Sequence, residues 1–149
     1  RPWATGGRSC YAPPMSTSIT AIRHHRNLSL LRLSLYAGAA YDAIFALAML
    51  LFPAFAAGLL GLRLPGDPYY LWLIAVFLLM VAAFYLLAAY DPRAYAGNIQ
   101  VGIVGRGCGF VALLAGALTD PSLSGLYLLA FADLTFAVLH AVFWWPIRR

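Results

Sequence analysis

Four long runs of apolar residues, separated by short polar segments rich in proline, dominate the pattern of this chain. They cover about residues 30–52, 69–90, 97–118 and 123–145. About 20 apolar residues cross the roughly 30 Å hydrocarbon core of a bilayer as a helix. Because lipid does not satisfy unpaired backbone groups, each run is expected to be a helix and not an open strand. The pattern therefore predicts an all-α fold, a four-helix transmembrane bundle.

Arginine residues are distributed unevenly between the two sides of this predicted bundle. The side that holds both termini and the middle loop carries eight of them: Arg1, Arg8, Arg23, Arg26, Arg32, Arg93, Arg148 and Arg149. The loops on the other side carry Arg63. Positive charge favours the cytoplasmic side, so we expect an N-in/C-in topology. The net charge of +5 then faces anionic lipid, and a nucleic-acid partner is not needed to explain it.

Composition agrees with a membrane protein and leaves room for one membrane domain, residues 28–149. Hydrophobic residues make up 63% of the chain and charged residues 10%, with a mean hydropathy of +0.80. Residues 1–27 are polar and arginine-rich, and we expect them to form a disordered basic cytoplasmic tail. Residue 1 is not Met, and an alternative start at Met15 would mean that residues 1–14 do not belong to the native protein.

Three charged residues interrupt the apolar runs at similar depths. Counted from the outer end of each run, Asp42, Arg106 and Asp133 lie about ten to twelve residues in, and a helix rises about 1.5 Å per residue. Ionisable groups are costly in hydrocarbon, so gathering them together is cheaper than exposing each to lipid. We therefore predict an intramembrane charge cluster, in which Arg106 pairs with Asp133 on the neighbouring run and Asp42 joins them.

This cluster has two interpretations. Two carboxylates and one guanidinium leave a net negative charge, which a proton, a bound cation or water that reaches the site can relieve. His140 follows Asp133 by seven residues on a similar helix face, so it is a candidate proton relay. In the other interpretation the arginine and Asp133 form a structural lock, Tyr41 or Tyr85 binds Asp42, and His140 is an interfacial residue. From the sequence we favour the lock.

Small residues recur along the third run at steps of three and four. They are Gly102, Gly105, Gly109, Ala112 and Gly116. Gly105 and Gly109 form the small-xxx-small pair that allows two membrane helices to approach closely. We interpret these residues as one helix-packing seam within the bundle, with self-association into a homo-oligomer as the alternative.

No residue pattern in the chain predicts a catalytic site, a metal site or a cofactor. The two cysteines are far apart in sequence, and Cys108 is expected to be a small packing residue. His140 is the one histidine at membrane depth, whereas a haem held by two histidines needs a pair. No zinc spacing, phosphate-binding loop or nucleophile elbow is present. We therefore expect a protein that is not an enzyme.

One stretch resembles a known group of proteins. The segment YLLAAYDPR at residues 85–93, followed by GIVGR at residues 102–106, is similar to uncharacterised small four-span bacterial membrane proteins, and the DoxX-like group is similar in size and layout. In those proteins a tyrosine-rich second helix ends in an Asp-Pro turn and a Gly-Arg or Gly-Lys pair lies in the third. The resemblance implies the four-helix fold and the bacterial cytoplasmic (inner) membrane, and it implies no activity.

Three functions are compatible with these features. The first, which the sequence favours, is a structural or accessory subunit of a larger membrane complex, held together by an Arg-Asp lock. The second is an oligomeric carrier of a small molecule, coupled to a proton or cation and using the Asp42, Arg106 and Asp133 cluster. The third is a membrane enzyme that modifies a lipid or a quinone.

Overall fold

The computed structural model describes residues 15–64 and 66–148, and this part of the chain contains helices and turns and no strand. The helices are α1 (Met15–Leu51), α2 (Pro53–Leu59), α3 (Pro68–Tyr90), α4 (Ala96–Thr119), the short 3-10 helix η1 (Pro121–Leu123) and α5 (Leu126–Trp144). The stretches long and apolar enough to cross a membrane are Ile22–Leu51, Tyr69–Tyr90, Ala96–Thr119 and Leu126–Trp144. The predicted all-α fold, with four helices long and apolar enough to cross a membrane, is confirmed.

Helix α1 begins earlier than the sequence predicts. It has 37 residues, so residues 15–27 are helical where the sequence predicts a disordered tail, and residues 1–14 lie outside the described residues. No proline or glycine interrupts the chain between Met15 and Gly38, so helical hydrogen bonding continues through the polar segment. Helix α5 begins later than predicted, at Leu126, because residues 121–123 form a separate 3-10 turn.

The turns between helices are built on three Asp-Pro pairs. Asp67 caps α3 by accepting a hydrogen bond of 2.9 Å from the backbone N–H of Tyr69, with Pro68 at the first helical position. Asp120 accepts in the same way from Ser122 at the start of η1. Asp91 ends α3 and accepts from the N–H groups of residues 93 and 94. These aspartates account for three of the five acidic residues in the chain.

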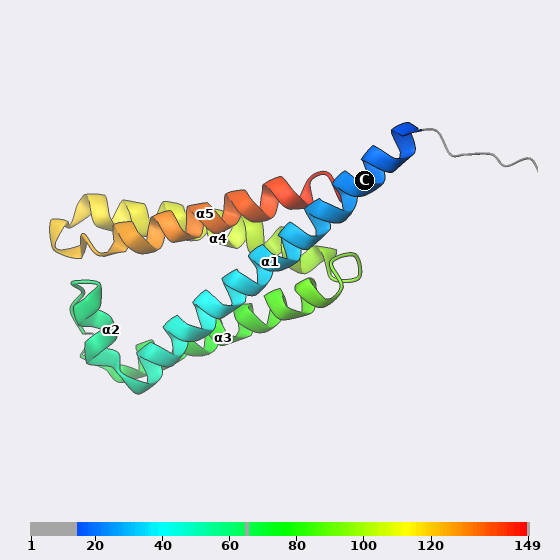
Figure 1. The fold of residues 1–149 in the computed structure, drawn as a ribbon. Helices are drawn as coiled ribbons and strands as arrows, with labels where there is room; N and C mark the ends of the chain where they lie inside the picture. The colour runs from blue at the N-terminus through cyan, green and yellow to red at the C-terminus, as the bar shows by residue number, and fades with distance from the viewer. Residues whose placement is uncertain (1–14, 65, 149) are drawn as a thin grey trace, which may run out of the picture.

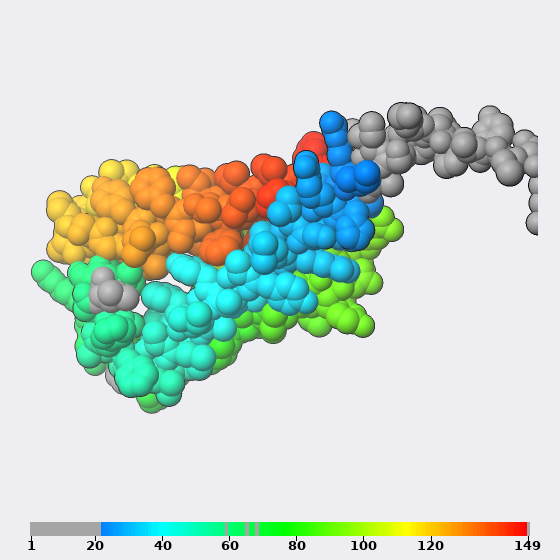
Figure 2. All heavy atoms as spheres, viewed as in Figure 1, coloured from blue at the N-terminus to red at the C-terminus, as the bar shows by residue number. Residues whose placement is uncertain are grey.

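The four long helices form two pairs that diverge toward one end. Helix α1 packs along α3 and α4 packs along α5, while the pairs meet mainly through α1 and α5, and α3 has few contacts with α4 (Figure 1). The pairs converge at the basic end, the end that holds Arg23, Arg32, Arg93 and Arg148. In the space-filling view, α1 and α5 meet toward this end and separate toward α2 (Figure 2).

The core follows the same division. At the basic end one buried cluster includes residues of all four long helices, among them Leu35, Tyr85, Ile99 and Trp144. Nearer α2 a second cluster is made by α1, α2 and α3 alone, around Ala46, Met49, Ala56 and Ala75. Many buried positions are alanines, which allow helix backbones to approach closely where lipid supplies no hydrophobic driving force.

Helix α2 fills part of the divergent end. It stops in a Schellman motif, in which Gly61 has φ +62° and the N–H groups of Gly61 and Leu62 bond to the carbonyls of Gly58 and Ala57. The backbone carbonyl of Leu60 then lies so close to Gly125 that a Cβ at residue 125 would overlap it. The end of α2 is therefore seated against the turn that precedes α5.

Candidate functional site

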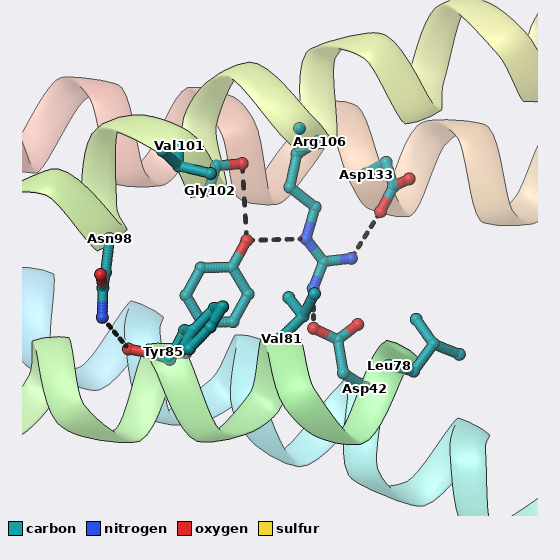
Figure 3. Close-up of a pocket in the computed structure, with 11 residues that line it drawn as sticks. Asp42, Leu78, Val81, Tyr85, Asn98, Val101, Gly102, Arg106 and Asp133 are labelled. Atoms are coloured by element: carbon teal, nitrogen blue, oxygen red, sulfur yellow. Dashed lines mark hydrogen bonds and ion pairs between the residues drawn. The ribbon is translucent and has the colours of Figure 1, made fainter. Parts of the chain in front are cut away.

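Arg106, in the middle of α4, connects all four long helices. Its Nη2 lies 2.7 Å from Oδ2 of Asp42 on α1, and its Nη1 lies 2.5 Å from Oδ1 of Asp133 on α5. Its Nε donates a hydrogen bond of 3.2 Å to the hydroxyl of Tyr85 on α3 (Figure 3). The structure thus brings together the three charged residues that the sequence analysis placed at one depth. We call Asp42, Arg106 and Asp133 the charge cluster.

Two glycines of α4 make room for the partners of Arg106. A Cβ at Gly102 would lie 2.6 Å from the ring of Tyr85, and a Cβ at Gly109 would overlap the Oδ2 atom of Asp133. The Tyr85 hydroxyl also donates to the carbonyl of Gly102 at 3.5 Å. Close approach of side chains to the α4 backbone is therefore what places both groups beside the guanidinium.

The predicted seam of small residues is only partly packed against other helices. Gly102, Gly109 and Gly116 face the bundle, and a Cβ at Gly116 would lie 3.1 Å from Leu126. Gly105 and Ala112 are exposed, and a Cβ at Gly105 would meet no atom within 4 Å. The interpretation as one packing seam within the bundle is thus wrong for Gly105 and Ala112, because they lie at the exposed edge of this face and not against another helix. Cys108 is also exposed and is not a packing residue.

Aromatic rings surround the guanidinium group. Its Cζ atom lies 5.4 Å from the ring centre of Tyr41, 5.5 Å from that of Tyr85 and 5.1 Å from that of Phe136. At these distances the negative face of a ring attracts a cation. The rings also keep lipid and water away from most of Arg106, whose side chain is 7% exposed.

The charges of the cluster do not balance. All three guanidinium nitrogens are bound, yet Asp42 keeps one buried oxygen, Oδ1, that has no hydrogen-bond partner among the described residues. An arginine stays protonated in proteins, so two ionised carboxylates leave one uncompensated negative charge. Burying such a charge is costly unless it is paired. The cluster is therefore complete only with one additional positive charge, as a proton or as a cation.

The charge cluster forms part of the wall of a cavity of about 390 Å³ between α3 and α4 (Figure 3). Cluster residues, Tyr85 and Asn98 supply its polar groups, and Asn98 donates from its side chain to the carbonyl of Phe84 at 3.4 Å. The remaining wall is apolar or glycine: Leu78, Val81, Phe84, Val101, Gly102 and Gly105. Asp133 is 16% exposed, whereas Asp42 is 1% exposed. Such a mostly apolar cavity with a few convergent polar groups is typical of a ligand site.

His140, the candidate proton relay, is fully buried near the cluster but is not hydrogen-bonded to it. Its Nε2 lies 3.2 Å from the carbonyl oxygen of Ser34, and its Nδ1 has no partner in the described part of the chain. Its ring packs against the rings of Tyr85 and Phe136, at 5.1 and 6.0 Å between centres. It is buried and not interfacial. A relay from Asp133 to His140 thus has no direct hydrogen-bonded path between the side chains of the described residues.

Sequence reasoning missed several residues of the site. The sequence offers Tyr85 as a partner of Asp42, but its hydroxyl binds Arg106 instead. Asn98 and Phe136 gave no signal, because an asparagine near a helix start and a phenylalanine in an apolar run are both common. The spacing of Phe136, three residues after Asp133, does place the two on one helix face. Residues 15–64 and 66–148 contain no group of three side chains suited to hold a metal ion.

Comparison of the chain with protein-family models, with curated proteins and with solved structures finds no match. The resemblance to the DoxX-like group therefore stays a prediction. The function has to be argued from the geometry of the cluster and its cavity.

Proposed function

We propose that this chain is a small membrane carrier that binds a proton or a cation at the charge cluster. The observation that carries the proposal is that the cluster lines a cavity. An ion pair that serves only as a lock needs no cavity beside it, since an adjoining void forfeits packing contacts. Sequence alone favours the accessory subunit, and the cavity is the reason to prefer the carrier.

The composition of the cluster supports the same proposal. One carboxylate would neutralise Arg106, and a second is present whose charge has no partner. Ionisable groups inside a membrane commonly mark ion pathways and proton relays. A cluster with one negative charge in excess is suited to alternate between a bound proton and a bound cation, which is the basic step of coupled exchange.

The proposed location is the bacterial cytoplasmic membrane, with both termini in the cytoplasm. Arg23, Arg26, Arg32, Arg93 and Arg148 lie at the basic end of the bundle, and Arg63 lies in the loop at the other end. Two contacts join α1 to the end of α3 and the following turn at the basic end: Arg32 donates to the carbonyl of Tyr90 at 3.3 Å, and Arg93 lies 3.1 Å from His24. Such an asymmetry favours a cytoplasmic basic end.

An accessory subunit of a larger membrane complex is the second candidate. The feature that favours it is that Arg106 bonds to residues of α1, α3 and α5, so the cluster also holds the bundle together. A subunit of this kind would be recovered from native membranes with a larger partner at fixed stoichiometry. A carrier would be recovered alone or as a homo-oligomer.

The carrier proposal is tested in proteoliposomes that contain a pH-sensitive dye and an acidic interior. Sodium, potassium or choline is added outside, and internal pH is recorded against protein-free vesicles. We expect at least one cation to raise the internal pH through the protein, and Asp42→Asn and Asp133→Asn to abolish the effect. Asp67→Asn is the matched control, because it removes a carboxylate outside the membrane and Asn is also a good helix cap. Absence of exchange in the unmodified protein, or unchanged exchange in both cluster variants, overturns the proposal.

A further inference from the structure

The cavity opens toward lipid between α3 and α4. Val101 and Phe84, which line it, are 69% and 43% exposed on the surface of the bundle. Gly105 is exposed beside them, directly before Arg106 in the middle of α4, and has open space where a side chain would lie. Gly105 lies in the middle of the apolar stretch Ala96–Thr119, so this opening is at membrane depth. A molecule dissolved in the bilayer can therefore reach the cluster without passing through water.

The polar groups that line the cavity select the chemistry of such a molecule. Each side chain that carries a donor already donates to a protein oxygen: Arg106 to two carboxylates, Tyr85 to Gly102, and Asn98 to Phe84. In the part of the chain that the structure describes, Oδ1 of Asp42 is a buried acceptor without a partner, and the excess charge is negative. An anionic ligand would add to the excess negative charge, and a neutral ligand that only accepts hydrogen bonds, such as a quinone, would leave that charge uncompensated. A ligand with one positive charge supplies the missing charge, and its N–H groups can donate to the carboxylate of Asp133, which is partly exposed.

We propose that the cavity binds a lipid-soluble primary or secondary amine in its protonated form, which enters from the bilayer between α3 and α4. This inference rests on the proposed function, of which it names the substrate class. The ammonium group binds at the charge cluster beside Asp133, the carboxylate that is partly exposed. The apolar part of the ligand lies against Leu78, Val81 and Val101. A cavity of about 390 Å³ is within the usual range for small-molecule sites.

Binding of dansylcadaverine tests the proposal directly. This probe joins a primary amine to a fluorophore that reports an apolar environment, and the dansyl amide of pentylamine is a matched compound without the terminal amine. Both are titrated against the protein in lipid nanodiscs. We expect the amine to bind at least about tenfold more tightly than its neutral analogue, a difference of about 1.4 kcal/mol. Equal affinity for the two compounds overturns the proposal.

Two glycine variants test the position of the site without removing a charge. Gly105→Leu places a side chain in the opening of the cavity, and Gly107→Leu places the same side chain on another face of α4; a Cβ at either glycine meets no atom within 4 Å. We expect Gly105→Leu to weaken dansylcadaverine binding at least about tenfold and Gly107→Leu to change it less than about twofold. Unchanged binding in the Gly105 variant contradicts the proposed route and site.

The outcomes also separate this inference from the carrier proposal. If the protein binds the amine but no cation changes the internal pH, the amine is supported as the ligand class and the carrier proposal is overturned. Proton exchange with sodium, potassium or choline, combined with no dansylcadaverine binding, retains transport and overturns the amine as ligand. Because the glycine variants leave Asp42, Arg106 and Asp133 in place, a loss of binding in Gly105→Leu is not explained by a disrupted charge cluster.

Discussion

Arg106 on α4 and Asp42 on α1 form an ion pair of 2.7 Å that crosses from one helix pair to the other. The partner Asp133 lies on α5, within the same pair as Arg106, so it does not bridge the two. The Asp42 contact, with the Tyr85 hydroxyl beside it, therefore ties the α1–α3 pair to the α4–α5 pair at the depth where they begin to diverge. The same residues line the cavity between α3 and α4. The site that is proposed to bind a cation therefore also holds the two helix pairs together.

Replacing Arg106 with glutamine should destabilise the protein severely. Asp42 and Asp133 would be left buried beside each other without a positive charge, and breaking a buried ion pair from one side typically costs about 3–5 kcal/mol. The free energy of unfolding is measured by titration with sodium dodecyl sulfate in mixed micelles. Arg63→Gln is the control, because Arg63 is exposed in a loop, and it should change stability by less than about 0.5 kcal/mol. Similar stability of the two variants would contradict the central position of Arg106.

A single methyl group at Gly102 should also destabilise the bundle. In Gly102→Ala the new Cβ would press on the ring of Tyr85, and overpacking of this kind costs about 1–3 kcal/mol. Gly97→Ala is a matched substitution on the same helix where a Cβ meets nothing, and it should be neutral or stabilising by up to about 1 kcal/mol. The same unfolding titration distinguishes them. Equal effects would mean that Gly102 is not needed for the close approach of Tyr85.

Removal of the Tyr85 hydroxyl tests the third partner of Arg106. Tyr85→Phe leaves the Nε of the guanidinium buried without an acceptor, at a cost of about 1–3 kcal/mol. Tyr69→Phe removes a hydroxyl from a residue that is 59% exposed, and it should have little effect. If Tyr85→Phe unfolds at the same detergent fraction as the unmodified protein, the hydroxyl contributes nothing to the cluster.

The sequence predicts the features that follow from the length of an apolar run or from the free-energy cost of a charge in the bilayer. Runs of about 20 apolar residues place the helices, and the expense of charge in lipid predicts that Asp42, Arg106 and Asp133 meet. Asp67, Asp91 and Asp120 precede prolines, so their turns are also predictable. Each of these inferences depends on residues close in sequence, or on depth alone.

The remaining features depend on how helices rotate and pair, which spacing does not determine. The glycine pattern of α4 resembles one seam, yet Gly102 faces Tyr85 while Gly105 faces outward. Helices α3 and α4 follow each other through a short turn but have few contacts, and the cavity arises from that separation. Helix α2 is only 7 residues long, so no periodicity could reveal it between two apolar runs.

Gly125→Ala should displace α2 from the start of α5, because a Cβ at residue 125 would overlap the carbonyl of Leu60. Spin labels at the exposed residues Phe55 and Leu128, introduced after replacement of the native cysteines by serine, report the distance between the two segments. We expect a longer or broader distance distribution than in the unmodified background. Gly66→Ala, where a Cβ meets no atom, should leave the distribution unchanged. Superimposable distributions for all three proteins would contradict the seating of α2.

Asp133→Asn separates a binding cluster from a lock, because it leaves one carboxylate for one guanidinium. The asparagine side-chain oxygen can still accept a hydrogen bond from Arg106, so charge balance improves while the contact is kept. The most direct test is cation-dependent proton exchange by this variant in proteoliposomes, after its unfolding titration has shown a folded protein. Our account predicts stability within about 1 kcal/mol of the unmodified protein and no proton exchange. A folded variant that exchanges protons at the unmodified rate would contradict it.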